Sequence, residues 1–266
     1  MDLIGHIKVI EDAGLSKGRL LNEEEILYAM FPNIAHCHEW AYQSLWNAHT
    51  DSNNNLIRIL QGHMICDYVI HYGPDYEENT SRIGWAYKEM PRALEMLDLF
   101  VEESKIRGFL EMDPRLTSDK DRFIRDFGHT AVECALDFSL AEDFSGTDRL
   151  NNIRSAFQKL GREERGNKFI EKVFKNTSGY TKEPLEKLLT TVDSYSNWSE
   201  KVKSPEEFAA FTLIEKYGLV DSTESLNFCV SFLKDLSDKL NKTKIDSMLY
   251  EITERVYNPN LAFQGR

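Results

Sequence analysis

The sequence predicts an all-α protein, a bundle of many helices with a metal site between its core helices. Apolar residues recur at helical spacing along most of the chain, and no run of β-branched residues alternates as a strand would. Gly and Pro fall between the periodic segments, at Gly73-Pro74 and at Asp113-Pro114 for example. Together, the helical periodicity, the lack of strand-like alternation and the position of Gly and Pro predict a series of consecutive helices.

Start signals support several of the expected helices. Asn22 precedes three glutamates, Ser118 stands three residues before Asp121, and Ser204 precedes Pro205. The expected helices cover residues 3–13, 23–31, 35–48, 56–72, 84–108, 119–143, 147–160, 163–175, 182–195, 205–217 and 223–257. The last one has an amphipathic stripe that we expect to pack on the rest.

Composition divides the chain near residue 145. All seven histidines lie in the first 129 residues; residues 1–144 carry 13 Lys and Arg against 26 Asp and Glu, whereas residues 145–266 carry 19 against 18. We expect a helical metal-binding core over 1–145 and a helical extension over 146–266, with one continuous domain as the alternative. Imidazoles and carboxylates gathered in one part of a chain suit a divalent cation.

Charge and hydropathy exclude some classes of protein. The net charge of −12 disfavours a nucleic-acid partner, because such affinity comes mostly from Lys and Arg. No stretch approaches about 20 apolar residues, so we expect no transmembrane segment. Residues 1–13 lack the apolar core of a signal peptide, which indicates a cytoplasmic protein. The four widely spaced cysteines are expected to be buried free thiols.

Two mostly apolar segments each carry a polar stripe with a spacing of four residues. His63, Asp67 and His71 form the first stripe, and His129, Glu133 and Asp137 form the second; each stripe begins with Gly-His. Residues four apart lie on one helix face, about 6 Å apart along the axis, so neighbours can share a metal. A buried carboxylate is costly unless a cation or hydrogen bonds compensate it. The alternative is local hydrogen bonding along each helix, and the glycines are expected to allow close helix contacts.

With these motifs, the sequence resembles the superfamily of zinc-dependent phospholipases C and single-strand-specific zinc nucleases. Over residues 1 to about 140 the family order of motifs corresponds to His6, a Pro32-Asn33 segment, His49, then His-x-x-x-Asp with a further histidine, then His-x-x-x-Glu. The resemblance implies an all-helical fold and a cluster of up to three zinc ions. The implied ligands are His6, His49, His63, Asp67, His71, His129 and Glu133.

The sequence departs from the family pattern in three ways. Asn33 stands where the family has a metal-binding aspartate, which puts a third metal or the base in question. The secreted enzymes use a freed amino terminus as a ligand, whereas this sequence starts at Met1. His36 or His38 can take the place of His49 in the pattern.

The expected function is hydrolysis of a small or lipid-like phosphoester by a metal-activated water, with two Zn²⁺ ions, or three, and no assigned catalytic residue. Asp137 is expected to orient a histidine ligand. A di-iron or di-manganese oxidase is the first alternative, disfavoured because the implied ligands include more histidines than carboxylates. The second alternative is a non-catalytic helical binding protein with a degenerate metal site. The substrate, the oligomeric state and the role of residues 146–266 stay open.

Overall fold

The computed structural model describes residues 3–35, 54–72, 84–103, 120–160, 168–169, 171–173, 201–217, 223–240 and 242–258. Within these ranges every regular element is a helix, so the prediction of an all-α bundle is confirmed. The elements are α1 (Leu3–Asp12), α2 (Glu23–Ala35), α4 (Asn55–Tyr72), α5 (Trp85–Glu103), α8 (Lys120–Ser139), the 3₁₀ helix η1 (Ala141–Phe144), α9 (Arg149–Leu160), α12 (Pro205–Tyr217), α13 (Thr223–Lys239) and α14 (Lys242–Tyr257). The helix expected at 182–195 lies outside the described residues, as does the one expected at 35–48 except for Ala35, which is the last residue of α2.

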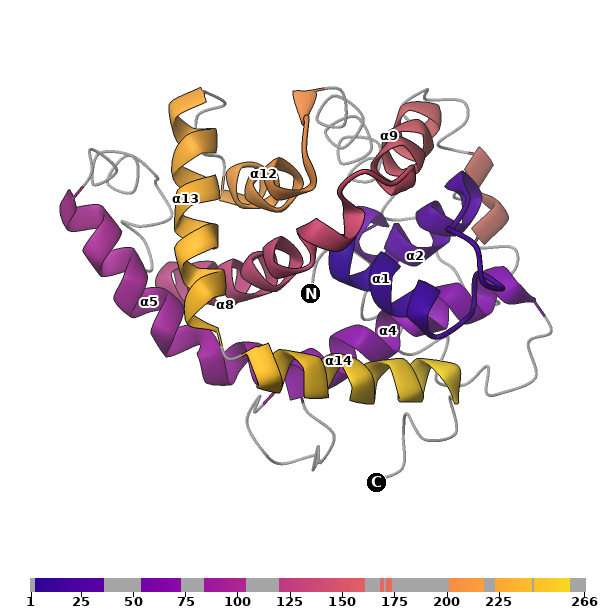
Figure 1. Ribbon diagram of the computed structural model, residues 1–266, viewed down its shortest axis with the longest axis horizontal. Helices are drawn as coiled ribbons and strands as arrows, with labels where there is room; N and C mark the ends of the chain where they lie inside the picture. Colours follow the sequence, from indigo (N-terminus) through magenta and orange to yellow (C-terminus); the bar gives the residue numbers. More distant parts are fainter. Residues whose placement is uncertain are drawn as a thin grey trace.

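Two helices organise the packing. α4 packs against α1, α2, α5 and α14, while α8 packs against α5, α12 and α13. α1 contacts both α4 and α8 and lies near the middle of the molecule (Figure 1). A single hydrophobic cluster contains side chains from α1, α4 and α8 together with side chains from α12, α13 and α14. The helices after residue 145 therefore cover the same core as the helices before it.

The helix starts expected at Asn22 and Ser204 are present. Asn22 Oδ1 accepts a hydrogen bond from the Glu25 backbone N–H at 3.0 Å, and Glu25 Oε2 accepts one from the Asn22 backbone N–H at 2.9 Å. This is a reciprocal capping box at the start of α2. Ser204 Oγ accepts a hydrogen bond from the Glu207 backbone N–H at 3.2 Å, directly before Pro205 in the first position of α12.

The region expected to form one helix over 223–257 forms two. α13 ends at Lys239 and packs on α12 and α8, whereas α14 begins at Lys242 and packs on α4 and α1. The apolar residues of this region follow one another at intervals of three or four, except from Leu240 to Ile245, where the interval is five. They are Leu226, Val230, Leu233, Leu236, Leu240, Ile245, Leu249, Ile252 and Val256. A helical face cannot continue across the interval of five, so the second helix turns to a different part of the core.

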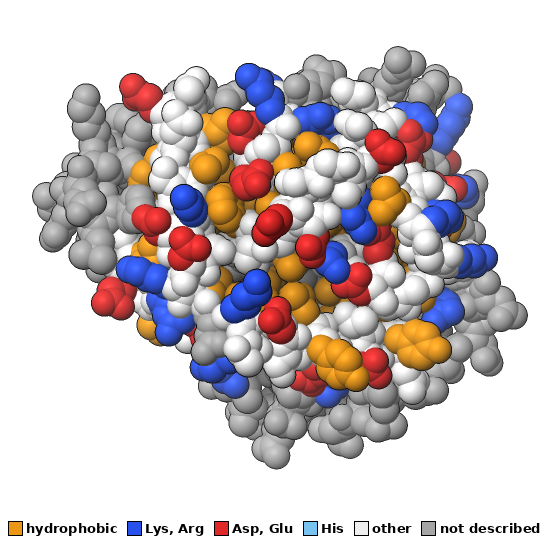
Figure 2. All heavy atoms as spheres, viewed as in Figure 1, with side chains coloured by type: hydrophobic (Ala, Val, Ile, Leu, Met, Phe, Trp, Pro, Cys, Tyr) orange, Lys and Arg blue, Asp and Glu red, His pale blue; other side chains and the backbone are white. Residues whose placement is uncertain are grey.

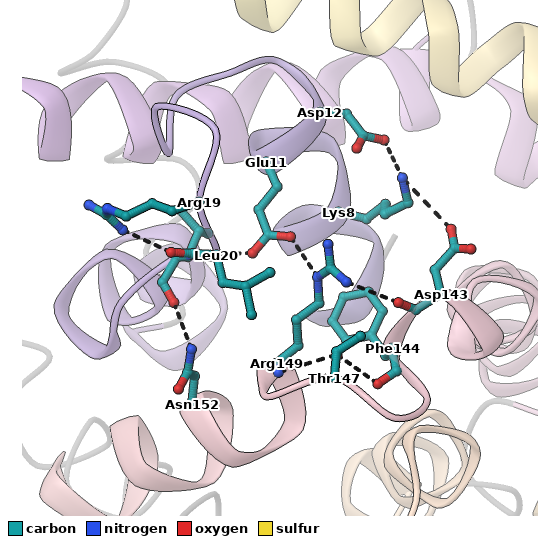
Figure 3. A network of polar contacts seen from close by, with 11 residues as sticks. Lys8, Glu11, Asp12, Arg19, Leu20, Asp143, Phe144, Thr147, Arg149 and Asn152 are labelled. Carbon is teal, nitrogen blue, oxygen red and sulfur yellow. Dashed lines mark hydrogen bonds and ion pairs between the residues drawn. The ribbon is translucent and has the colours of Figure 1, made fainter.

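A polar network holds α1 against the segment that follows α8 (Figure 3). Arg149 donates from Nε to Glu11 Oε2 at 2.7 Å and from a terminal nitrogen to the Asp143 carbonyl oxygen at 3.0 Å. Its guanidinium lies 5.3 Å from the centre of the Phe144 ring. The other oxygen of Glu11 accepts the Leu21 backbone N–H at 2.9 Å. One buried carboxylate thus connects α1, the loop before α2 and the start of α9.

On the face shown in Figure 2, acidic and basic side chains are interspersed, so the net negative charge is not gathered there into one patch. None of the described helices combines the length and apolar character needed to span a bilayer. Cys66, Cys134 and Cys229 are buried free thiols, as expected, and Cys37 lies outside the described residues.

Candidate metal centre

Three of the predicted ligands lie along α4 at intervals of one helical turn. His63 is fully buried, Asp67 is 3% exposed, and His71 is partly exposed in the last turn of the helix. α4 can hold these polar groups in the core because α1 and α8 bring further histidine and carboxylate side chains to the same face. Two separate groups of side chains result, one around Asp67 and one around His71.

The first group consists of His6 from α1 with His63 and Asp67 from α4. The Asp67 carboxylate faces a nitrogen of each ring: Oδ1 is 3.0 Å from His6 Nε2 and Oδ2 is 3.1 Å from His63 Nε2. The rings are stacked, with centroids 3.8 Å apart and planes inclined by 8°. All three side chains are almost completely removed from solvent. A buried carboxylate placed in this way needs compensation by hydrogen bonds or by positive charge.

The second nitrogen of His63 fixes the state of its ring. His63 Nδ1 lies 2.5 Å from the carbonyl oxygen of Ala29 on α2. A carbonyl oxygen only accepts hydrogen bonds, so Nδ1 must be the donor. A neutral ring then presents its lone pair at Nε2, toward the Asp67 carboxylate. Nε2 of His63 and Oδ2 of Asp67 would then both be acceptors, only 3.1 Å apart. Such a pair needs a cation, either a proton on Nε2 or a metal ion bound by both residues.

Asp137 positions the helix that carries His6. Its Oδ2 accepts the Ile4 backbone N–H at 2.7 Å and its Oδ1 accepts the Gly5 backbone N–H at 3.1 Å. These are first-turn N–H groups of α1, which lack partners within their own helix. The carboxylate also complements the positive end of the helix dipole. The sequence predicted that Asp137 orients a histidine; the structure shows it bound instead to the backbone N–H groups of Ile4 and Gly5, the two residues before His6.

The second group consists of His71 from α4 with His129 and Glu133 from α8. His71 Nε2 is 2.8 Å from Glu133 Oε1, and His129 Nδ1 is 3.6 Å from Glu133 Oε2. The two imidazole rings have centroids 4.9 Å apart. His129 Nε2 is buried and has no hydrogen-bond partner among the described residues. A buried ring nitrogen without a donor or acceptor opposite it is available as a ligand atom.

Burial separates the two groups. Side-chain exposure is 23% for His71, 14% for His129 and 11% for Glu133, against 0%, 0% and 4% for His6, His63 and Asp67. Solvent therefore reaches the second group more readily than the first. Catalytic metal sites keep a position open for water or substrate, whereas structural sites are closed by protein ligands. By this criterion the second group is the one suited to take a ligand from solution.

The ionisation states in the second group suit a divalent cation. Burial, with smaller contributions from the charges of His71 and Lys216, lowers the pKa of His129 to about 4, so this imidazole is neutral at pH 7. Burial alone would raise the pKa of Glu133, but neighbouring positive charge and the hydrogen bond from His71 hold that pKa well below its ordinary value. A neutral imidazole and an ionised carboxylate are the forms that bind metals.

Two residues that the sequence analysis did not select also shape the second group. The Tyr87 ring on α5 lies 4.6 Å from the His129 ring and 6.3 Å from the His71 ring, measured between centroids. Gly84 donates its backbone N–H to the His71 carbonyl oxygen at 3.0 Å. A Cβ atom at Gly84 would lie 2.1 Å from the Ile70 carbonyl oxygen. The sequence indicates this close contact between the start of α5 and the end of α4 only through the glycine itself.

The glycines before each stripe do lie at close helix contacts. A Cβ atom at Gly62 would be 3.2 Å from side-chain atoms of Ile10 on α1 and Val256 on α14. At Gly128 it would be 2.7 Å from Leu94 on α5. These glycines bring α1 toward α4 and α5 toward α8, the pairs that supply the metal-ligand candidates and Tyr87.

The structure therefore brings six of the seven predicted ligands together, three in each group. The seventh, His49, and the alternatives His36 and His38 lie outside the described residues. Asn33 is half-buried near the end of α2. The donor set of the two groups, four imidazoles and two carboxylates, fits zinc or another borderline divalent cation.

The comparisons with known proteins give no relative. No family model matches the sequence, and neither a curated protein nor a solved structure matches it. The functional argument therefore depends on the geometry of the two groups.

Proposed function

We propose that the protein is a metal-dependent phosphoric ester hydrolase that binds two divalent cations, most simply Zn²⁺. His6, His63 and Asp67 would hold one ion, and His71, His129 and Glu133 would hold the other. The observation that carries the proposal is the His63 ring, whose Nδ1 donates to Ala29 while Nε2 faces Asp67. A metal-binding histidine characteristically donates its other N–H to a backbone carbonyl or a carboxylate in this way.

Bound divalent cations would supply electrophilic activation of a phosphoryl group and a nucleophilic water at neutral pH. The chain supports this chemistry with groups of defined ionisation. Glu133 stays ionised and His129 stays neutral, so neither requires a proton change to act as a ligand at pH 7. Asp137 accepts from the backbone of α1 just before His6, and the Ala29 carbonyl accepts from Nδ1 of His63.

The ligand balance favours hydrolysis over oxygen chemistry. Di-iron and di-manganese bundles supply four carboxylates and two histidines, whereas the two groups here contain two carboxylates and four histidines. Two further buried carboxylates have other partners: Glu25 pairs with Arg19, and Glu89 pairs with Arg92. Neither is available to complete a carboxylate-rich centre.

The test is the metal content of the full chain, measured by inductively coupled plasma mass spectrometry beside hydrolysis of bis(4-nitrophenyl) phosphate. We expect about two zinc ions per chain in the wild type and about one in His63→Ala and in His129→Ala, since each variant removes one group. Hydrolysis should fall at least about 100-fold in His63→Ala and Glu133→Ala. Glu142→Ala, an exposed carboxylate outside both groups, is the matched control and should keep both properties.

Other results would overturn the proposal. Full hydrolysis in both His63→Ala and Glu133→Ala would exclude these groups from the reaction. Iron with a visible absorption band after exposure to oxygen would favour oxidase chemistry instead. A chain that takes up no metal after reconstitution would be a helical scaffold whose buried carboxylates are compensated by protonated histidines.

A further inference from the structure

A lysine from the second half of the chain lies beside the second group. Lys216, in the last turn of α12, places Nζ 2.6 Å from Oγ1 of Thr130 on α8. Thr130 directly follows His129 and precedes Glu133 by three residues. Residues three apart are neighbours on a helix surface, so the Lys216 ammonium is held within about one turn of Glu133.

The hydrogen bond to Thr130 holds the ammonium of Lys216 in place, although the lysine residue is exposed. Thr130 is 2% exposed, and its hydroxyl accepts from an ammonium whose own residue is exposed to solvent. The ammonium therefore lies on the boundary between the core and the surface, next to the group that solvent reaches more readily.

A phosphoester is an anion, and residues 1–144, which supply both groups, carry 13 Lys and Arg against 26 Asp and Glu. Binding it therefore calls for positive charge in addition to the metal ions. Lysine is a common binder of phosphate oxygens because its ammonium is a compact charge with three donors. We propose, on the basis of the proposed function, that Lys216 binds a non-ester oxygen of a phosphate or phosphoester at the open side of the second group. α12 would then complete the substrate site, which gives the second half of the chain a part in it.

The experiment titrates the zinc-loaded full chain with inorganic phosphate by isothermal calorimetry, with zinc content measured on the same samples. We expect Lys216→Met to raise the Kd for phosphate about tenfold, equivalent to about 1.4 kcal/mol, and Lys216→Arg to raise it less than about threefold. Lys203→Met, an exposed lysine just before α12, is the matched control and should leave the Kd unchanged. Zinc content should be the same in all four proteins.

A second variant covers the case in which Lys216→Met fails to fold. Thr130→Val keeps the shape of the buried side chain and removes the oxygen that holds the ammonium, so it should also raise the Kd for phosphate while zinc content stays at the wild-type value. Unchanged phosphate affinity in Lys216→Met or in Thr130→Val, with zinc retained, overturns this inference alone. So does a zinc-loaded wild type that binds no phosphate. A wild type without zinc overturns the proposed function itself.

Discussion

The Nδ1 atom of His63 lies 2.5 Å from the carbonyl oxygen of Ala29, and this contact determines what the first group can do. It keeps a hydrogen on Nδ1 and turns Nε2 toward Asp67. The second group has a different arrangement, since His129 Nε2 has no hydrogen-bond partner among the described residues. Two histidines at equivalent positions of two similar stripes are thus held by different forces, one by a backbone hydrogen bond and one by ring packing.

The tautomer of His63 is the first prediction. In the zinc-loaded protein we expect nitrogen-15 NMR of the imidazole to show a hydrogen on Nδ1 and none on Nε2, because Nδ1 faces a carbonyl and Nε2 faces a carboxylate across the site of the cation. The His63→Ala variant assigns the signal. A hydrogen on Nε2 of the zinc-loaded protein would mean that His63 bonds to Asp67 directly and binds no metal.

The second prediction concerns Asp137 as the N-terminal partner of α1. Asp137→Asn replaces one of its two acceptor oxygens with a donor that faces a backbone N–H, so we expect a loss of about 2–3 kcal/mol in the free energy of unfolding. Urea denaturation of the metal-free protein measures it. Asp143→Asn alters an exposed carboxylate 3.7 Å from Lys8 and should change stability by less than about 0.5 kcal/mol. Equal effects in the two variants would show that Asp137 does not anchor α1.

The sequence predicted those parts of the fold and of the candidate site that depend on local spacing. Asn22 and Glu25 are three residues apart and form the expected capping box. The two stripes place five of the six ligand candidates at one-turn intervals, and the sixth, His6, comes from α1. The break between α13 and α14 also has a local signal, the five-residue interval from Leu240 to Ile245. The prediction of one long helix did not take this interval into account.

The parts that the sequence did not predict depend on contacts across long separations. The Ala29 carbonyl has no sequence signal, because every residue type supplies a carbonyl oxygen. Nothing in the sequence distinguishes Tyr87 from the other aromatic residues. Its contact with the His129 ring results from the packing of α5 against α8. Thr130 and Lys216 are 86 residues apart, and neither belongs to a motif. Such partners follow from the packing of helices, which a periodic pattern does not specify.

Gly84 provides the third prediction. In Gly84→Ala the new Cβ would lie 2.1 Å from the Ile70 carbonyl oxygen and 2.3 Å from the His71 carbonyl carbon, so the backbone at the end of α4 must shift. We expect a loss of about 3 kcal/mol in stability by urea denaturation and weaker zinc binding in the second group, because His71 moves with its backbone. Gly146→Ala, at a φ of 69° in open space, should cost only about 1 kcal/mol and leave zinc binding intact. Normal stability of Gly84→Ala would contradict this packing.

The fourth prediction is a pH dependence that comes from Glu25. Burial tends to raise its pKa, but hydrogen bonds from Arg19 and from the Asn22 backbone lower it below its ordinary value in the folded protein. A carboxyl whose pKa is lowered on folding contributes stability above its unfolded pKa, and this contribution is lost as the pH falls through the folded pKa. Urea denaturation with EDTA should show Glu25→Gln less stable than the wild type by about 1–2 kcal/mol at pH 7.

The difference in stability between the wild type and Glu25→Gln should shrink steadily below pH 4.5. The wild-type carboxyl then becomes protonated and, like the glutamine, carries no charge. Glu24→Gln, which changes an exposed carboxyl on the same helix turn, is the control and should show little difference at either pH. A difference between wild type and Glu25→Gln that stays constant from pH 7 to pH 3 would show that the charge of Glu25 contributes nothing.

The last prediction assigns Tyr87 a positioning role toward His129. The two rings are inclined by 31° with centroids 4.6 Å apart, and Tyr87 also approaches the His71 ring, so its ring limits the rotation of His129. In Tyr87→Leu we expect the zinc affinity of the second group to fall about tenfold while that of the first group is retained. A competition titration with a chelator, carried out in the His63→Ala background for the second group and in the His129→Ala background for the first, separates the two affinities.

Tyr87→Phe distinguishes positioning by the ring from a role of the hydroxyl. It keeps the ring and should therefore restore the zinc affinity of the second group to near the wild-type value, which a general loss of packing would not predict for one group alone. If Tyr87→Phe is as weak as Tyr87→Leu, the hydroxyl holds the site and the ring contact is incidental. If both groups lose zinc equally in Tyr87→Leu, the side chain supports the bundle as a whole, and His129 depends on α8 rather than on Tyr87 for its orientation.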